Sequence, residues 1–500
     1  MSRINTNVTS LLSQRILKNN NSSLNTSLER LSTGLAINRG KDDPAGLIAS
    51  ENLRSEKASI NAAIDNAERA DQVMNIAEGG LQEVSALLLE VQGLVGESAN
   101  DAGLSKEEKE ANQLQIDSIL QTIDRIASST NFQGAKLLNG NFDFTVSGQD
   151  PNVSDYQINA AKLGYGETRD VEVVITASAQ HAGLFISTNG ALDLTNATST
   201  FTFEIAGSKG SREFSFASGT SLDSMVEAIN TFKDVTGVSA AVSGVTGFSI
   251  KSVEYGSNEF VSFDVISQGG QAGSVVQLSA NNENDLSGTS STFANVTNPI
   301  RDSGQDIGAI INGIAATSDG RTARIATDFL DMEIEISAAS GGADTLQTIS
   351  ALTITGGGAK FNLGPSVDIN NQVSIGLGNV ASRKLGDINV GYLDDLGSGN
   401  SSNLVDGDLE TAQKIVDAAI SQVSSLRGKI GAFQSNVINS TINSLGVALE
   451  NTSAAESSIR DTDFASETAA MTRAQILSSA STNILSIANS QPQAALQLLG

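Results

Sequence analysis

Residues 53–95, LRSEKASINAAIDNAERADQVMNIAEGGLQEVSALLLEVQGLV, decide the fold of this chain. From Ile60 onward the apolar residues follow one another in alternating steps of three and four, at Ile60, Ala63, Ala67, Ala70, Met74, Ala77, Leu81, Val84, Leu88, Val91 and Val95. This spacing is a heptad repeat, which places one apolar stripe along a helix. A helix over this stretch would be about 65 Å long at about 1.5 Å rise per residue. Such a rod cannot bury its stripe alone, so the chain must supply a partner.

A second heptad stripe begins after Asp406-Gly407-Asp408, near the other end of the chain, and runs through Val416, Ala419, Val423, Leu426, Ile430, Phe433 and Val437. Beyond Val437 the stripe moves by one residue, which we interpret as the drift of a period of about 3.6 against one of about 3.5. The two stripes predict an antiparallel coiled coil. Its packing residues are Ile60, Met74, Leu81, Val84, Leu88, Val91, Val423, Leu426, Ile430, Phe433 and Val437.

Local signals refine this prediction. Asp43 followed by Pro44 predicts a helix start, with the aspartate as N-cap. Gly79 and Gly80 lie inside the long helix, and we interpret both as a close approach by a neighbouring helix rather than a break. Isoleucines at 116, 119, 123 and 126 predict another helix over residues 106–129, with the long helix as its partner.

The two ends of the chain carry thinner helical stripes, and each predicts one half of an interface. The packing residues expected there are Leu24, Leu28, Leu31, Leu35, Leu477, Ile484 and Leu498. A polar run at residues 19–23 interrupts the first stripe, and Ser481, Gln491 and Pro492 weaken the last one. Copies of both ends from other subunits could complete the buried core.

The middle of the chain, about residues 141–402, is rich in Gly, Ser, Thr and Asn, and alternating runs such as 142–146 and 171–175 predict strands. The expected class is α+β: a helical bundle with a β-rich insert of two or more small modules. We divide the chain into a terminal coiled coil of 1–45 with 455–500 and a rod of 46–140 with 403–454. The insert comprises a β-rich connection (141–200), an α+β module (201–295) and a β-rich module (296–402).

The composition of the chain narrows the classes of function that it could have. The 500 residues carry a net charge of −26, which disfavours binding to nucleic acid or to an anionic membrane. Cysteine is absent, so disulfides and thiolate chemistry are excluded. No window is apolar enough for a membrane span, and the first residues lack a signal-peptide core. The first 41 residues are basic, with Arg3, Arg15, Lys18, Arg30, Arg39 and Lys41 against Glu29. They form either an arm for an acidic neighbour or a solvated helix face.

Motifs for catalysis or metal binding are missing. The one histidine, His181, is expected in a surface loop, and Asp42-Asp43 is interpreted as a helix start rather than a metal site. The glycine runs at 356–358 and 376–378 do not fit a nucleotide-binding loop. Residues 150–155 fail the EF-hand pattern because Asp155 stands where glycine is needed. We expect no enzyme activity and no cofactor.

Several motifs resemble bacterial flagellin. They are Ile4–Asn7, the run LERLSTGLAINRGKDDPAGL at 28–47, AEGGLQE at 77–83, NFQGAKLL at 131–138, IRDTDF at 459–464 and NILSIANSQPQAALQLL at 483–499. The middle, with residues 221–230, 236–240 and 255–257, is similar to the module repeated in flagellins and hook-associated proteins.

The resemblance implies a subunit that assembles with copies of itself into the extracellular flagellar filament used for swimming. It implies export through the flagellar secretion channel, a chaperone for the C-terminal segment, and the filament cap and hook-associated proteins as partners. Two alternatives stay open: a hook–filament junction protein, and a secreted adhesin whose insert binds glycans.

Two further expectations concern the surface. Flagellins that Toll-like receptor recognises carry basic residues on the long helix where this chain has Glu90 and Gln92, and Gly93 replaces an acid. This departure predicts weak recognition by that receptor. Dense Ser and Thr, for example at 195–202 and 287–292, predict O-linked glycans on the insert.

Overall fold

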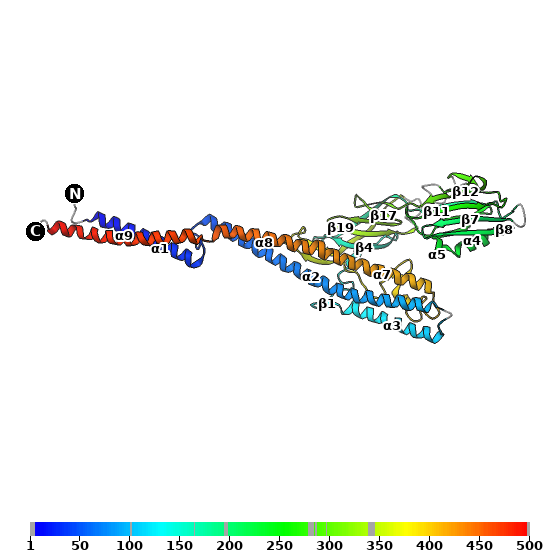
Figure 1. Cartoon of the computed structure of the whole chain (residues 1–500), viewed down its shortest axis with the longest axis horizontal. Helices are drawn as coiled ribbons and strands as arrows, with labels where there is room; N and C mark the ends of the chain where they lie inside the picture. Colours follow the sequence, from blue (N-terminus) through cyan, green and yellow to red (C-terminus); the bar gives the residue numbers. More distant parts are fainter. Residues whose placement is uncertain are drawn as a thin grey trace. The chain divides into compact units, whose positions relative to one another are not determined.

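The computed structural model describes residues 6–100, 103–164, 166–194, 199–278, 285, 288–296, 298–338 and 346–497. Contacts divide the chain into two compact units. The terminal unit comprises Met1–Asp71, Asn362–Asn371 and Phe433–Gly500, and the central unit comprises Gln72–Phe361 and Gln372–Ala432. The predicted α+β class is confirmed, with helices from both ends of the chain and strands between them (Figure 1).

The helices of the terminal unit are α1 (Val8–Thr33), the first part of α2 (Pro44–Ser98), a π-helical segment η3 (Phe433–Ile438), α8 (Asn439–Arg460) and α9 (Phe464–Gln497). In this unit α2 and α8 run antiparallel, because Glu51 accepts from Arg460 at 3.0 Å while Lys57 pairs with Glu456 at 3.4 Å. Ile60 and Ala63 of α2 pack with Leu445 of α8. The predicted start of α2 is confirmed: Asp43 Oδ1 accepts from the main-chain nitrogens of Ala45 and Gly46.

The helical part of the central unit contains the rest of α2, α3 (Lys106–Ser129) and α7 (Leu409–Ala432). Arg427 of α7 pairs with Glu78 of α2 at 2.8 Å, and Gln92 donates to Asp417 at 2.7 Å, so α7 is antiparallel to α2 as well. Asn112 of α3 donates to Ser98 of α2. The short elements beside these helices are β1 (Asn131–Phe132), β2 (Ala135–Lys136), β23 (Gly386–Asp387), β24 (Gly391–Tyr392) and η2 (Leu393–Leu396).

The one-residue shift of the second stripe has a local cause, so our interpretation of it as gradual drift is wrong. The π-helical turn η3 occupies Phe433–Ile438, where the apolar line moves from Val437 to Ile438. A π turn accommodates one extra residue and therefore rotates all later residues relative to the stripe before it.

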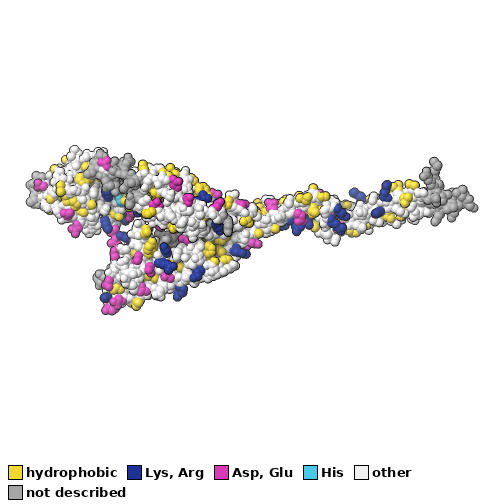
Figure 2. Space-filling view, turned by 180° about the vertical axis from the view of Figure 1, so that it is seen from behind, with side chains coloured by type: hydrophobic (Ala, Val, Ile, Leu, Met, Phe, Trp, Pro, Cys, Tyr) yellow, Lys and Arg dark blue, Asp and Glu magenta, His cyan; other side chains and the backbone are white. Residues whose placement is uncertain are grey.

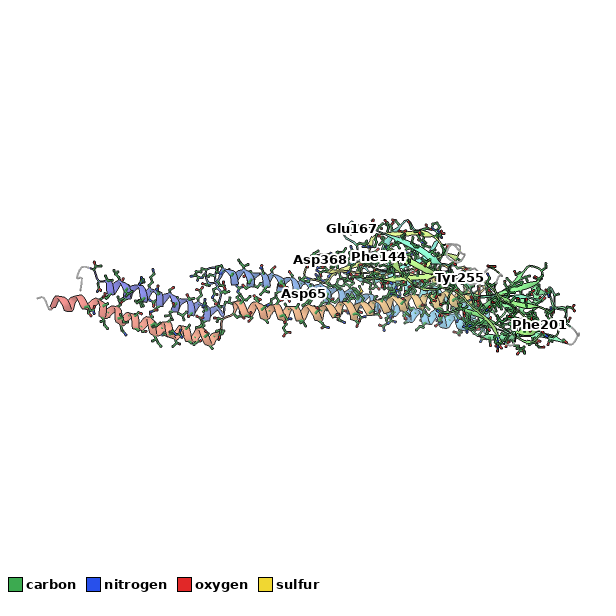
Figure 3. The ribbon with its side chains drawn as sticks, turned by 90° about the horizontal axis from the view of Figure 1, so that it is seen from above. Asp65, Phe144, Glu167, Phe201, Tyr255 and Asp368 are labelled. Carbon is green, nitrogen blue, oxygen red and sulfur yellow. The ribbon has the colours of Figure 1, made fainter. Side chains whose placement is uncertain are left out.

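The first β module consists of two antiparallel sheets. One has the order β16 (Ile314–Ala315), β15 (Gly308–Ile311), β5 (Arg169–Ala177), β20 (Thr348–Gly357), β3 (Phe144–Ser147). The other has the order β17 (Thr317–Asp319), β18 (Thr322–Ala326), β19 (Leu330–Ile336), β4 (Val153–Ala161). Their alternating residues share one apolar core that includes Phe144 (Figure 3). A further pair is β21 (Ala359–Asn362) with β22 (Gln372–Ile375).

The second β module spans residues 183–303. One sheet has the order β13 (Ser290–Thr292), β12 (Ser274–Gln277), β6 (Gly183–Ser187), β10 (Gly247–Ser252), β9 (Val238–Ser243). The other has the order β14 (Ile300–Ser303), β11 (Phe260–Ser267), β7 (Thr200–Gly207), β8 (Ser211–Ala217). Helices α4 (Leu222–Asn230), α5 (Lys233–Thr236) and η1 (Phe293–Asn295) complete it. Its core is built around phenylalanines, with Phe201 at its centre (Figure 3). His181 lies in the loop before β6, where it is half-buried and its ring is tilted against that of Tyr255, with the two ring centroids 3.7 Å apart.

The two glycines inside α2 have different surroundings, and our interpretation of Gly79 is wrong. A Cβ at Gly79 would meet nothing within 4 Å, whereas one at Gly80 would lie 2.8 Å from Leu138 Cδ1 and from Thr130 Oγ1. The close approach at Gly80 comes from Thr130, the C-cap residue of α3, and from Leu138, which follows β2. Only Gly80 therefore has a packing reason to lack a side chain.

Gly79→Ala should raise the free energy of unfolding of the monomer by about 1 kcal/mol, because alanine is favoured over glycine inside a helix by about that amount. Gly80→Ala should lose this gain, since its methyl group must displace Leu138 or Thr130. Urea unfolding followed by circular dichroism measures both. Equal stabilisation by the two substitutions would contradict the difference in packing.

Lys429 of α7 is a half-buried cation opposite the first β module. Burial lowers its pKa from 10.5 to about 8, although the carboxylates of Glu333, Asp331 and Asp143 raise it and Arg324 adds to the lowering. Burial also raises the pKa of Asp143. The charged form of Lys429 is therefore less favourable in the folded chain than in the unfolded one.

Lys429→Met should stabilise the monomer at neutral pH by about 1 to 2 kcal/mol, after allowance for the remaining exposure of the ammonium group. Below pH 8 Lys429 is protonated in both the folded and the unfolded state, so its destabilising effect is constant. Between pH 8 and 10.5 the unfolded state binds more protons than the folded state, so the free energy of unfolding of the wild-type chain rises with pH. The advantage of the variant should therefore shrink across this window in urea unfolding at several pH values. A pH-independent difference would show that the effect is not electrostatic.

Candidate assembly interface

Helices α1 and α9 pack against each other through small polar residues. Asn7 Nδ2 donates to the Ala488 carbonyl at 2.7 Å, Ser10 Oγ to Asn489 Oδ1 at 2.6 Å, and Asn20 Nδ2 to Ser481 Oγ at 2.8 Å. The buried residues of α1 are all serines, at 10, 13 and 27. Short side chains allow the two helices to approach closely, and the hydrogen bonds satisfy the polar groups that this contact buries. The buried residues of α9 are Ala474, Ser481 and Ala488, so within one chain the shared side of this helix pair consists of small residues, most of them polar.

The same two helices also carry large apolar side chains that remain exposed. The large apolar residues that remain between 44% and 64% exposed are Val8, Leu11, Leu12, Ile16, Leu28, Phe464, Ile476, Leu477, Ile484 and Ile487. Figure 2 shows hydrophobic side chains along the terminal helices, with basic side chains among them. Exposed apolar groups that gather in this way mark sites of protein–protein contact.

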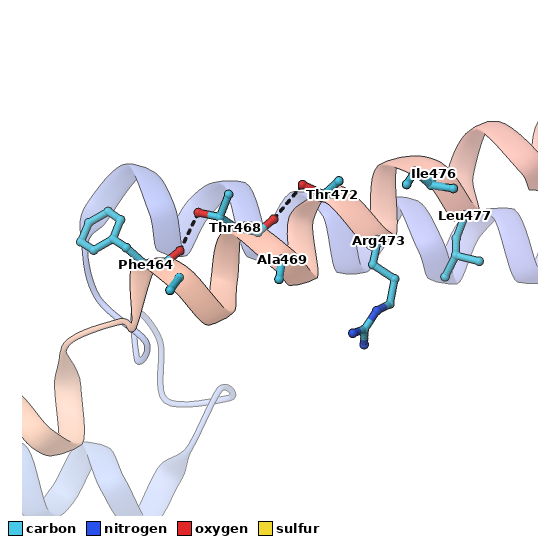
Figure 4. A pocket seen from close by; sticks show the side chains of 8 residues that line it. Phe464, Thr468, Ala469, Thr472, Arg473, Ile476 and Leu477 are labelled. Carbon is cyan, nitrogen blue, oxygen red and sulfur yellow. Dashed lines mark hydrogen bonds between the residues drawn. The ribbon is translucent and has the colours of Figure 1, made fainter.

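Several of these exposed side chains line a groove along α9 (Figure 4). Phe464, Ala465, Thr468, Ala469, Thr472, Arg473, Ile476 and Leu477 line it. Thr468 Oγ1 donates to the Phe464 carbonyl at 2.5 Å, and Thr472 Oγ1 donates to the Thr468 carbonyl at 2.9 Å. Because these hydroxyl groups already have partners on their own helix, the groove contributes mainly apolar contact surface.

The break between α1 and α2 lies beside the break between α8 and α9. Gly34 ends α1 in the left-handed conformation, with φ of 75°, and its carbonyl accepts from Thr462 N at 2.9 Å. Ala36 N donates to the Arg460 carbonyl at 2.7 Å, and Leu35 and Asp461 form a β-bridge. Residues 28–47 and 459–464, which carried the family resemblance, therefore meet in one junction.

Carboxylates organise this junction. Asp42 accepts from the main-chain nitrogens of Arg39 at 2.8 Å and Asn38 at 3.2 Å, and these bonds, the one from Arg39 first, hold the pKa of Asp42 below its usual value. Asp463 starts α9 by accepting from Ala465 N at 2.9 Å. Prediction from sequence missed that the two helix breaks pair with each other, through the β-bridge between Leu35 and Asp461.

The basic residues near the N-terminus divide into two groups. Arg30 pairs with Glu467 at 3.5 Å, and Arg39 pairs with Glu29 at 2.7 Å. Arg15 and Lys18 are exposed on α1, and Arg3 lies outside the described residues. Both alternatives for this arm therefore stay open for Arg15 and Lys18.

The residues expected to pack in the rod are buried or nearly so. Ile60, Met74, Leu81, Val84, Leu88, Val91, Val423, Leu426, Ile430 and Phe433 are each at most 8% exposed, and Val437 is half-buried. The residues expected at the chain ends differ. Leu28, Leu477 and Ile484 are exposed, Leu24, Leu31 and Leu35 are half-buried, and Leu498 lies outside the described residues.

Prediction from sequence missed Ile16, Phe464, Ile476 and Ile487 among the exposed apolar residues. Ile476, Ile484 and Ile487 follow a helical spacing, which could have revealed them as a stripe beside the one that we chose.

In the receptor-contact region, Glu90 and Gly93 are exposed, and Gln92 is half-buried against Asp417 of α7.

A helix pair that packs through small residues and leaves large apolar side chains exposed is typical of a protein that assembles with other molecules. Sequence comparisons give the family. The chain matches the families described as "Bacterial flagellin N-terminal helical region" over residues 4–143, "Bacterial flagellin C-terminal helical region" over 413–499 and "Flagellin hook IN motif" over 200–254.

Two relatives match over whole chains. The chain is 30% identical over 523 residues to a flagellin of Salmonella typhimurium and 30% identical over 536 residues to the B-type flagellin of Pseudomonas aeruginosa, with 99% of both chains covered each time. Among solved structures, a flagellar hook associated protein-3 of Legionella pneumophila is similar over 81% of this chain and 97% of its own, at 11% identity and a TM-score of 0.29. The chain belongs to the bacterial flagellin family.

The chain is therefore a structural subunit of the extracellular flagellar filament and not an enzyme. Its full-length flagellin relatives favour this role over a junction protein or an adhesin. None of the helices in the described ranges combines the length and the apolar content that a membrane span requires.

Proposed function

We propose that copies of this chain bind one another in the filament through the terminal unit, with the exposed apolar side chains of α1 and α9 as the contact. The observation that supports this proposal is the exposure of large apolar residues on both helices while small residues occupy the side that the two helices share. Each such side chain that an interface buries contributes about 1.5 to 3 kcal/mol. Burial of several together would hold a subunit in place.

Removal of residues 471–500 tests this role. The shortened chain should fail to elongate filament seeds, because it lacks Ile476, Leu477, Ile484 and Ile487 and leaves α1 without its partner. Electron microscopy after seeding measures elongation. Long fibres from the shortened chain would overturn the proposal.

We keep the division of the chain as a proposal. The terminal coiled coil is 1–45 with 455–500, and the rod is 46–140 with 403–454. The insert is 141–200, 201–295 and 296–402. Strand β5 of the first insert segment pairs with β15 and β20 of the third, whereas β6 of the same first segment pairs with β10 and β12 of the second. Separate unfolding of 201–295, measured by hydrogen exchange on the whole chain, would test the proposed boundaries.

The filament subunit assembles with other flagellar components. We propose in addition that a chaperone binds the C-terminal segment before the chain is exported. The groove on α9 and the exposed isoleucines beyond it support this proposal, because an unassembled chain would otherwise present them to water. A co-purified chaperone should be lost when residues 471–500 are removed. Its retention would place the binding site elsewhere.

We also propose weak recognition by Toll-like receptor. Glu90 and Gly93 are exposed on α2 where the resemblance implies basic and acidic contacts, and Gln92 is engaged with Asp417. Monomer should elicit a small response from reporter cells. A response as strong as that to a typical flagellin would contradict this.

O-linked glycans on the insert are a further proposal, supported by the dense Ser and Thr at 195–202 and 287–292. Protein taken from filaments should then be heavier than the bare chain of 51.6 kDa. An intact mass equal to that of the bare chain would exclude them.

A further inference from the structure

Three asparagines in this chain are followed directly by glycine, at Asn139, Asn189 and Asn312. Glycine has no side chain to hinder its main-chain nitrogen, so that nitrogen can attack the amide carbon of the preceding asparagine. These pairs are therefore the positions where spontaneous loss of the side-chain amide is chemically easiest. Their folded surroundings decide which of them reacts.

Two of the three asparagines are held by hydrogen bonds. Asn312, in the turn between β15 and β16, accepts from Glu172 N at 2.8 Å through Oδ1 and donates to the Asp170 carbonyl at 3.1 Å through Nδ2. Asn139 accepts from Asn141 N at 3.1 Å and forms a β-bridge with Asn379. Both residues are partly buried. Their amides must leave these partners before the ring that precedes deamidation can close.

Asn189 differs from both. It is exposed in the turn after β6, although it shares the left-handed conformation, with φ of 59°, with Asn312, whose φ is 49°. Within the described part of the chain, no hydrogen bond reaches the Asn189 side chain. Its amide can therefore rotate toward Gly190 N without losing a contact.

We propose that Asn189 is a site of spontaneous deamidation in the folded subunit, at which this chain acquires a new carboxylate. Hydroxide removes the proton from Gly190 N, the nitrogen forms a bond to Asn189 Cγ, and the Cγ–Nδ2 bond breaks so that ammonia leaves with a proton from water. Water then opens the five-membered imide at either carbonyl. One opening gives aspartate, and the other gives isoaspartate.

The site lies beside an ordered part of the second β module, so the two products differ in their consequences. The preceding residue, Thr188, is 1% exposed; its nitrogen donates to the Thr246 carbonyl at 2.9 Å and its carbonyl accepts from Gln271 at 2.8 Å. Aspartate adds only charge. Isoaspartate adds a methylene group to the main chain next to Thr188 and should loosen these bonds.

Peptide mass spectrometry of the full chain tests the proposal after incubation in mildly alkaline buffer, once folded and once in urea. In the folded chain, Asn189 should deamidate about ten-fold faster than Asn312 and faster than Asn139, since each hydrogen bond that must open slows the reaction. In urea the three rates should converge. Equal rates in the folded chain, or a slower reaction at Asn189, would overturn the proposal.

Two matched variants test whether the acidic form arises at Asn189 or at another asparagine. Asn189→Gln should remove the early acidic form on native isoelectric focusing, because glutamine would have to close a larger ring, whereas Asn139→Gln should leave that form unchanged. Circular dichroism confirms that both variants are folded. An acidic form that persists in Asn189→Gln would place the reaction elsewhere and refute the assignment.

Discussion

Ile484→Asp is expected to stop elongation of filament seeds while the monomer remains as stable as the wild-type chain. Ile484 is 56% exposed in the single chain, so a carboxylate there costs the monomer little. In the proposed contact, the same carboxylate would lose water without gaining a partner, and the burial of one isoleucine would be lost. A total cost of about 3 kcal/mol per subunit lowers the affinity for a growing end about 100-fold. Electron microscopy and sedimentation after seeding measure the effect.

The matched control is Val245→Asp in the second β module. Val245 is 86% exposed, more than Ile484, and lies in the turn between β9 and β10. The substitution makes the same chemical change outside the terminal unit, and elongation should continue. Urea unfolding must show equal monomer stability for both variants. Normal filament growth of Ile484→Asp under these conditions would show that this part of α9 does not belong to the contact between subunits.

The helices of the rod could be predicted because only a helix places the residues of this apolar stripe on one side. Eleven apolar residues from Ile60 to Val95 repeat on one helical face, and no strand can satisfy that spacing. The predicted helix of residues 106–129 is confirmed at both ends, although we did not use the capping box that starts it, between Ser105 and Glu108. The π turn at 433–438 could not be separated from drift, since both move the stripe by one residue.

The β modules and the chain ends were less predictable, for different reasons. Alternation identified strands such as 171–175, but it does not select partners, and β5 pairs with strands more than a hundred residues later. At the ends, the leucines and isoleucines predicted half of an interface that other subunits could complete, whereas serines, asparagines and alanines make the contact within one chain. A sequence shows that an apolar stripe needs a partner, but it does not say whether that partner lies in the same molecule.

Phe203→Ala is expected to destabilise the second β module by about 3 to 5 kcal/mol, the usual cost of emptying a phenylalanine site in a core. Phe203 is fully buried, and its ring lies 5.1 Å from that of Phe201 and 4.8 Å from that of Phe263. Hydrogen exchange on the full chain should show lost protection in β7 and β11. Peptides of α2 and α9 should exchange as in the wild-type chain.

Phe216→Ala is the matched control, because Phe216 is only partly buried against the same core and its loss should cost less. Filament growth on seeds should survive both substitutions, since neither changes the terminal unit. This outcome would complement that of Ile484→Asp: one change removes assembly without affecting stability, and the other removes local stability without affecting assembly. If Phe203→Ala also stopped growth while α1 and α9 kept their protection, the second β module would have to contribute to the contact between subunits.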